Sequence, residues 1–253
     1  MLGWTDSCCE LSERGTRLSG LGAPAPTKGP SCQAFAERVV LDVVWEMSAQ
    51  GIDPGAAEAR HGKMDINEAI SGRRSAREYT AQAVDEQTIR RLIDAAVHAP
   101  NAVNQQPWMF TVLRDQGLLD RISRDAKAHM LATVLPTMPA DPQSDHFRSL
   151  LNDPHFHIFY RAPVLILISA IAQGPWIVED CALAAENLML AAYAARLGTC
   201  WIGFAQSFLN TSDGKKALGL PAASVAVAPI IVGHPKTAPP PVLRKEPEIR
   251  WVG

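Results

Sequence analysis

Hydrophobic and polar positions follow two different periods along most of the chain, and together they predict helices interspersed with strands. Apolar residues recur at helical spacing in three segments, residues 85–97, 118–131 and 177–197. Three further segments read as strands, residues 108–113, 164–171 and 225–232. The run at 164–171 is continuously apolar, which is typical of a strand buried on both faces. Interspersed helices and strands indicate an α+β or α/β architecture.

Capping residues predict where several helices begin and end. Asp85 and Ser212 precede helical segments and can act as N-caps, whereas Gly198 follows the longest helix and is expected to end it. Asp65 and Glu68 have the spacing of a capping box ahead of a short helix at residues 66–71.

Residues 135–154 interrupt this regular pattern. Four prolines punctuate them, so we expect a loop-bearing excursion with one or two helical turns around residues 146–151. Long irregular insertions of this kind often cover binding sites.

The first 63 residues differ from the rest. Residues 19–30 are rich in Gly, Pro and Ala and are expected to form a loop or disordered linker. Apolar residues between Phe35 and Met47 then recur at helical spacing, and residues 51–62 break the order again. The chain is therefore predicted to have two parts: an N-terminal extension, residues 1–63, partly disordered with one amphipathic helix, and a domain formed by residues 64–253.

Composition narrows the classes of function. The 253 residues carry a formal net charge of −2, so no global basic field attracts nucleic acid. The five cysteines show no CxxC pair and no Cys/His ligand spacing, which suits the reducing cytoplasm. The longest apolar run, residues 162–172, is far shorter than the roughly 20 residues of a membrane span. Acidic residues interrupt the N-terminus, which therefore does not read as a secretory signal.

The stretch from Gly72 to Tyr79 concentrates candidate chemistry. Arg73, Arg74 and Arg77 fall within five positions together with Ser75. Guanidinium groups grip phosphate bidentately and stay charged at any relevant pH, and a hydroxyl adds a further donor. From these residues alone, a solvated basic helix end is the more common explanation.

Four segments taken in order resemble the FMN-dependent nitroreductase family. They are RRSAR at 73–77, HAPNAVNQQPW at 98–108, ENLMLAA at 186–192 followed by LGTCWIG at 197–203, and VGHP at 232–235 with a proline-rich, arginine-bearing tail to Trp251. The resemblance covers residues 64–253.

The resemblance implies a fold and a reaction. The fold is a homodimeric α+β structure, with a central, mostly antiparallel sheet flanked by helices and two FMN sites at the dimer interface. In the implied ping-pong reaction, NADH or NADPH gives a hydride to flavin N5, and a nitroaromatic, quinone or similar electrophile then takes the electrons. The flavin carries this chemistry, and the protein binds, orients and tunes it.

The same resemblance assigns cofactor-binding residues. They are Arg73, Arg74, Ser75, Arg77, Pro100, Asn101, Ala102, Asn104, Ile202, Gly203 and Arg244. The first three would hold the FMN phosphate, as would Arg244, for which Lys245 is a substitute. Arg77 would lie beside the N1–C2=O edge of the ring and stabilise the negative charge of the reduced form. Residues 100–104 would reach the flavin of the partner subunit, and the backbone at 202–203 would face flavin N5.

Several alternatives stay open from the sequence. The same fold could serve a flavin-binding or sequestering protein with little turnover, or a dehalogenating or flavin-consuming enzyme. His155 and His157 fit a pocket rim better than a metal site, because a third ligand is missing. Cys200 reads as a small buried hydrophobe without an activating partner. Neither the physiological acceptor nor the preferred nicotinamide can be read from the residues.

Overall fold

The computed structural model describes residues 64–253. The linker and the amphipathic helix predicted within residues 1–63 lie outside the described residues.

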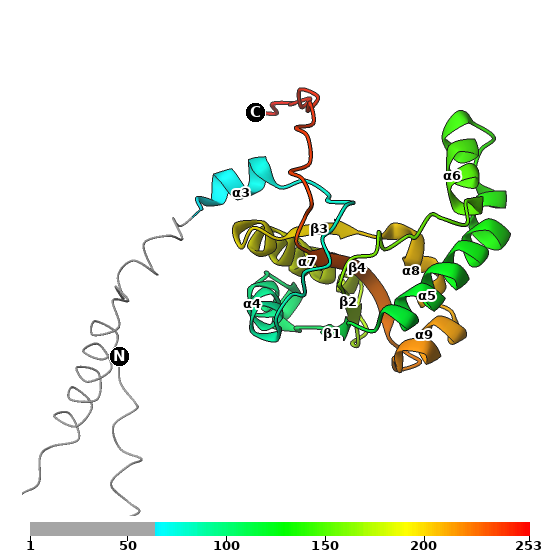
Figure 1. Ribbon diagram of the computed structural model, residues 1–253. Coiled ribbons are helices and arrows are strands. Elements are labelled where there is room, and N and C mark those ends of the chain that lie inside the picture. Colours follow the sequence, from blue (N-terminus) through cyan, green and yellow to red (C-terminus); the bar gives the residue numbers. More distant parts are fainter. Residues whose placement is uncertain (1–63) are drawn as a thin grey trace, which may run out of the picture. The chain divides into compact units, whose positions relative to one another are not determined.

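A four-stranded sheet organises this part of the chain (Figure 1). Its order is β1 (Trp108–Leu113), β2 (Val164–Ala170), β4 (Val225–Gly233) and β3 (Gly198–Trp201). All three pairings are antiparallel, so the prediction of a mostly antiparallel central sheet is confirmed. All seven residues of β2 are buried, as its unbroken apolar run predicted.

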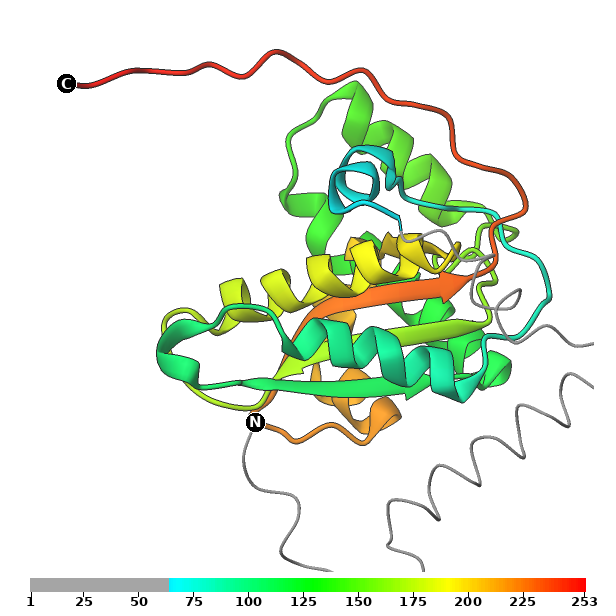
Figure 2. The same ribbon diagram turned by 90° about the vertical axis from the view of Figure 1, so that its left-hand side faces the viewer.

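Helices cover both faces of the sheet, and alternate residues of β2 point to different cores. Leu165 and Leu167 belong to one core cluster, and Ile166 and Ile168 belong to the other. The helices are α3 (Ile66–Gly72), α4 (Glu86–Val97), α5 (Gln116–His129), α6 (Pro142–Asn152), α7 (Ile177–Ala194), α8 (Gly203–Leu209) and α9 (Ser212–Leu218). Figures 1 and 2 show α4 and α7 on one face, and α5, α8 and α9 on the other. The α+β class is thereby confirmed.

Two of the predicted helix starts need correction. Asp85 caps α4 as predicted, because its side chain accepts a hydrogen bond from Thr88 N at 2.8 Å. The cap of α9, however, is Thr211 rather than Ser212, and its hydroxyl accepts from Gly214 N at 3.1 Å. Asp65 stands at the N-cap of α3 without a side-chain cap bond, so the capping box does not form.

The end of α7 differs from the prediction, which gave this role to Gly198. The helix ends at Ala194, and Arg196 takes the left-handed conformation with φ 61°. Leu197 N then donates to Ala192 O at 2.8 Å, a bond that closes the last turn. Gly198 instead opens β3, where a Cβ would lie 2.6 Å from the Ala76 Cβ. Glycine is therefore required at position 198 for close packing, and not to terminate α7.

The excursion at residues 135–154 contains more helix than expected. Its residues 142–152 form α6, which has 11 residues, against the one or two turns predicted. Asp141 caps it by accepting from Ser144 N at 2.7 Å, and Pro142 occupies the first turn. Proline is compatible with that position because no intrahelical N–H is needed there. A residue that we read as a helix breaker therefore begins a helix.

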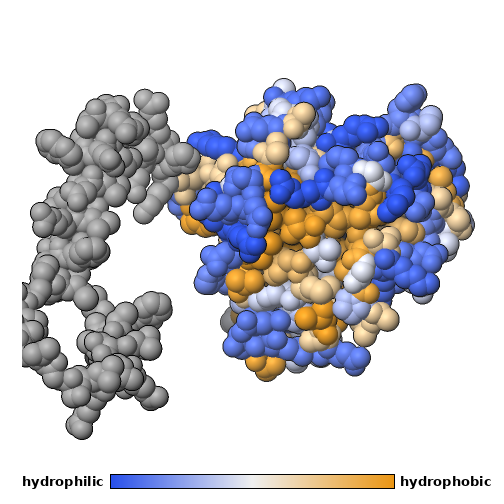
Figure 3. All heavy atoms as spheres, turned by 60° about the horizontal axis from the view of Figure 1, so that its bottom comes forward, coloured by the Kyte–Doolittle hydropathy of each residue, from blue (hydrophilic) through white to orange (hydrophobic). Residues whose placement is uncertain are grey.

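The surface of the described chain carries exposed apolar side chains. Figure 3 shows a band of hydrophobic residues across one face, with hydrophilic residues around it. Large exposed apolar residues include Ile66 and Ile70 of α3, Val103, which is 90% exposed, and Trp176 ahead of α7. No helix among residues 64–253 is both long and apolar enough to cross a membrane.

Candidate functional site

The arginine stretch leaves α3 and runs along the edge strand β3. Ser75 forms a bridge with Thr199, and Ala76 N donates to Thr199 O at 2.9 Å. Tyr79 pairs with Pro235 beyond the end of β4, and its buried hydroxyl donates to Ala76 O at 2.8 Å. The stretch is thus an extended segment fixed against the sheet, and the alternative of a solvated helix end is wrong for Ser75 to Tyr79.

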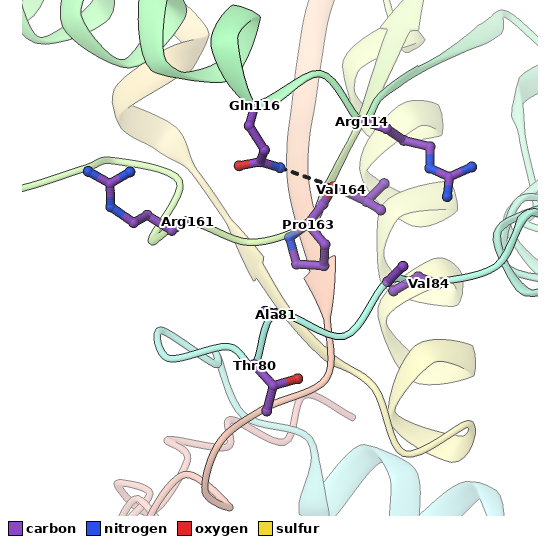
Figure 4. Close-up of a pocket in the computed structure, with 9 residues that line it drawn as sticks. Thr80, Ala81, Val84, Arg114, Gln116, Arg161, Pro163 and Val164 are labelled. Carbon is purple, nitrogen blue, oxygen red and sulfur yellow. Dashed lines mark hydrogen bonds between the residues drawn. The ribbon is translucent and has the colours of Figure 1, made fainter.

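The structure has a cavity of about 370 Å³ that none of the arginines of this stretch lines. That cavity, drawn in Figure 4, is lined by Thr80, Ala81, Ala83, Val84, Arg114, Gln116, Arg161, Pro163 and Val164. Figure 4 shows Arg114 and Arg161 at opposite sides, with their guanidinium groups pointing away from each other. Gln116 Nε2 donates to the carbonyls of Ala162 and Pro163 at 3.3 and 3.4 Å. Its polar groups do not converge on one point, and no predicted cofactor residue lines it.

A second cavity, of about 330 Å³, gathers the predicted phosphate-binding side chains. It is lined by Arg73, Arg74, Ser75, Arg77, Pro239, Pro240, Val242 and Arg244. Four arginines and one serine therefore line a single space. The C-terminal tail supplies Arg244, which the sequence placed here on the resemblance alone. Such a donor set suits a phosphate or another anion.

Two of these arginines hold buried donors without a partner. The Nε atoms of Arg73 and Arg74 are buried and make no hydrogen bond to the described chain. Arg73 Nε lies 3.6 Å from a carboxylate oxygen of Glu186, beyond hydrogen-bonding distance. A buried donor left unpaired costs free energy, which an anionic ligand would recover by accepting from it.

Arg74 also has a local role. Its Nη1 donates to Ser71 O at 2.6 Å and to Arg73 O at 2.8 Å, at the end of α3. A cationic side chain there satisfies helix-terminal carbonyls and complements the helix dipole. Arg73 therefore has more of its donors free for a ligand than Arg74 has.

A third cavity adjoins the second through Arg77, which lines both. Its volume is about 220 Å³, and its lining residues are Arg77, Ile158, Tyr160, Cys200, Trp201, Ile202, Gly203 and Phe204. Gly203 is the first residue of α8, so its N–H has no intrahelical acceptor. A Cβ at Gly203 would meet nothing within 4 Å. The chain thus leaves open space over the backbone that was predicted to face a flavin ring.

Three aromatic side chains, Tyr160, Trp201 and Phe204, line this cavity. Phe159 is fully buried in a core cluster, whereas Tyr160 lines the cavity. Tyr160 packs edge-on against Phe156 with ring centroids 5.7 Å apart, and its backbone is left-handed with φ 49°. Phe204 and Trp201 were missed as lining residues. Their position beside the 202–203 motif was the available signal.

Burial governs the ionisable groups of the third cavity. It raises the pKa of the Tyr160 phenol, an effect that the charge of Arg77 partly opposes. It also raises the pKa of the Cys200 thiol, against smaller opposing effects of Arg77, Ser75 and Arg73. Both groups therefore stay protonated at neutral pH. This confirms Cys200 as a buried, unactivated cysteine.

The two histidines of the sequence analysis lie in the irregular segment between α6 and β2. His157 Nε2 lies 3.0 Å from Asp120 Oδ1, and burial lowers the pKa of His157 although Asp120 opposes this effect. His155 is exposed. Within the described residues, no group of three or more His, Cys, Asp or Glu could hold a metal ion.

The amide-rich turn lies on the opposite side of the sheet from the arginine stretch. It precedes β1, and β1 and β3 are the two edge strands. Asn101 Oδ1 accepts from Gln106 N at 2.8 Å, and Ala102 N donates to Asp180 Oδ1 at 3.0 Å. A single chain therefore brings together the arginine stretch and residues 202–203, but not Pro100, Asn101, Ala102 or Asn104.

Comparisons with known proteins agree with this geometry. A model of the nitroreductase family matches residues 70–234. A protein of Methanothermobacter thermautotrophicus named "Putative NADH dehydrogenase/NAD(P)H nitroreductase" is 28% identical over 187 residues, which cover 72% of this chain and 83% of that protein.

Solved structures share the fold. A nitroreductase with bound FMN from Bacteroides fragilis superposes with a TM-score of 0.60 at 23% identity, over 74% of this chain and 95% of that one. An iodotyrosine deiodinase bound to FMN and 3-iodo-L-tyrosine gives a TM-score of 0.61 at 19% identity, over 75% of this chain and all of that one.

Proposed function

The chain belongs to the nitroreductase family and is an NAD(P)H-dependent flavin oxidoreductase, and from that premise we propose that it uses FMN to reduce nitroaromatics, quinones or similar electrophiles. One observation carries the proposal: a cavity surrounded by arginines adjoins a cavity with an open backbone face, and Arg77 lines both. FMN has the matching two ends, a phosphate and a planar ring.

The residues present fit FMN. Arg73, Ser75 and Arg244 would hold the phosphate, and the unpaired Nε of Arg73 gives one of them a donor in need of an acceptor. Arg74 would contribute those of its donors that do not bind the carbonyls of Ser71 and Arg73.

At the ring end, the chain supplies charge and access. Arg77 is the one residue lining the third cavity that carries a charge at neutral pH, so it would favour a form of the ring bearing negative charge. Ile202 N donates to Pro229 O at 2.8 Å, which fixes the backbone ahead of Gly203. Bound FMN supplies hydride transfer between the nicotinamide and the acceptor.

We further propose that the enzyme is a homodimer in which Pro100, Asn101, Ala102 and Asn104 of one subunit meet the FMN of the other. Their position at the far edge of the sheet requires a second copy if they are to reach the cavities. Exposed apolar side chains on α3 and on the turn itself, including Val103, support such an interface. Asn101 Nδ2 lies at the long distance of 3.5 Å from Ala99 O, so it has donor capacity left.

Residues 64–253 would form the whole catalytic unit. A cytoplasmic location is proposed from the cysteine usage, and the two cysteines in the described residues, Cys181 and Cys200, are free and buried.

The decisive experiment is an absorbance spectrum of the purified protein, followed by anaerobic titration with NADH and with NADPH. A bound flavin that bleaches with a nicotinamide and recovers when a nitroaromatic or a quinone is added is the expected result. Flavin that does not bleach would favour a sequestering protein. Recovery with 3-iodo-L-tyrosine, and not with nitroaromatics, would favour the dehalogenating alternative. Absence of protein-bound flavin after incubation with FMN and removal of the free flavin would reject the cofactor.

A further inference from the structure

Asp180 combines deep burial with an incomplete set of partners. Its residue is 3% exposed, in the first turn of α7. Oδ1 accepts from Ala102 N at 3.0 Å, whereas Oδ2 is buried and makes no hydrogen bond to the described chain. No Lys, Arg or His of residues 64–253 forms an ion pair with it. A buried carboxylate without a cation is costly, and the Ala102 N–H and the dipole of α7 offset part of that cost.

The segment that Asp180 holds is a strained turn. Val103, Asn104 and Gln106 all have positive φ, at 48°, 54° and 47°. The left-handed conformation is unusual for any of them and most unfavourable for the β-branched Val103. Such a backbone persists only where its surroundings hold it in place.

Few contacts tie this turn to the rest of the protein. Gln106 N donates to Asn101 Oδ1 and Gln106 Nε2 donates to Asn104 Oδ1, and both bonds lie within the turn. Gln105 Nε2 donates to Gln173 O at 3.1 Å, an exposed contact. The bond from Ala102 to Asp180 is the more buried anchor, and it joins the turn to the long helix of the core.

We propose that Asp180 is a positioning residue: by accepting the Ala102 N–H, its buried carboxylate fixes the strained turn at residues 101–106 in the form that presents Asn101 and Asn104 to FMN. The effect on FMN binding rests on the proposed function, whereas the hydrogen bond from Ala102 to Asp180 does not. Since Ala102 N–H is already used, the turn would contact FMN through side chains rather than through this amide.

The experiment compares four single variants of the full chain and the double variant Asp180→Ala/Ala102→Pro. Asp180→Ala removes the acceptor, and Asp180→Asn keeps an oxygen that can accept the same N–H. Ala102→Pro removes the donor: Asn101 has φ −148° and ψ 154°, the conformation that a residue before proline adopts, and proline is tolerated at the first position of a helical turn. Glu179→Gln, at the exposed neighbour of Asp180, is the matched control.

Two measurements test separately whether Asp180 holds the turn and whether the held turn favours FMN binding. Hydrogen–deuterium exchange of residues 101–106 without FMN should be about tenfold faster in Asp180→Ala, and the FMN Kd should rise about tenfold, as the loss of a charge-assisted hydrogen bond implies. Asp180→Asn should stay within about threefold of wild type in both, and Glu179→Gln should match wild type. Ala102→Pro should raise the Kd as Asp180→Ala does, and the double variant should be no worse than either single one.

The proposal would be overturned if Asp180→Ala had the same exchange rates at residues 101–106 and the same FMN Kd as wild type. It would also be overturned if the double variant lost as much FMN affinity as the two single variants together. If Asp180→Ala does not fold, Ala102→Pro carries the same test without altering α7. If wild-type protein binds no FMN, the proposed function fails, and the exchange data still show whether Asp180 anchors the turn.

Discussion

Gly203→Ala should have opposite effects on the protein without FMN and on its affinity for FMN. Gly203 is not in the left-handed region, because Gly219 is the glycine with positive φ among the described residues. An added Cβ would meet no atom of the chain within 4 Å. Nothing in the fold therefore resists alanine at this position, where glycine is the poorer helix former.

The magnitude follows from these two facts. Replacing a helical glycine by alanine gains at most about 1 kcal/mol, which corresponds to a rise in Tm of no more than roughly 4 °C for a domain of this size. If the ring of FMN packs directly on the Gly203 backbone, the same methyl group overfills the complex. Overpacking costs about 1–3 kcal/mol, or a Kd raised roughly 5- to 140-fold.

The assay is a thermal melt of the protein without FMN, followed by fluorescence titration with FMN. Gly198→Ala is the contrasting variant, because its Cβ would lie 2.6 Å from the Ala76 Cβ and should lower the Tm of the protein without FMN. An unchanged FMN Kd in Gly203→Ala would refute the reasoning, since the open space would then not be where the ring lies. A lowered Tm without FMN would show that the backbone at Gly203 is less accessible than the structure indicates.

The other predictions concern charge. Arg73→Ala should raise the FMN Kd by about 10- to 100-fold, since charge-assisted bonds to the phosphate are lost; equilibrium dialysis measures it, and an unchanged Kd contradicts the assignment. Arg77→Ala should lower the flavin reduction potential while much of the FMN stays bound; a potentiometric titration identical to wild type rejects that role. His157 has a pKa lowered by burial, so the unfolded chain binds its proton more readily and stability should fall as pH drops below about 6.5. His157→Gln should flatten the slope of denaturation midpoint against pH between about 7.5 and 5.5, and an equal slope in both proteins argues against burial as the cause.

Periodicity was sufficient for most elements of the fold, and it failed where a decision depended on contacts. The strands at 108–113, 164–170 and 225–233 follow directly from their apolar runs. Gly198 was assigned to the wrong role because helix termination and close packing both select glycine, and only the neighbouring Ala76 distinguishes them. The extent of α6 was underestimated because proline at a first helical position looks, in sequence, like proline in a loop.

The candidate site could be predicted to a similar degree. Arg73, Ser75, Arg77 and Arg244 line one cavity although 170 residues lie between the first and the last. That convergence came from the family resemblance, since no periodicity links the C-terminal tail to residue 73. The contact of Asp180 with the turn could not be predicted, because its bond to Ala102 spans 78 residues and has no local signature.

The ring end of the site depends on one charge rather than on an acid–base pair. Of the residues that line the third cavity, Tyr160 and Cys200 could ionise besides Arg77, and burial raises the pKa of both. Neither gains a charge as pH rises through neutrality, and Arg77 does not lose one. The charges on the residues that line this cavity are therefore constant across the physiological range. If FMN binds here as we propose, the position of Arg77 would tune the flavin, so displacement of that side chain should matter more than protonation of any neighbour.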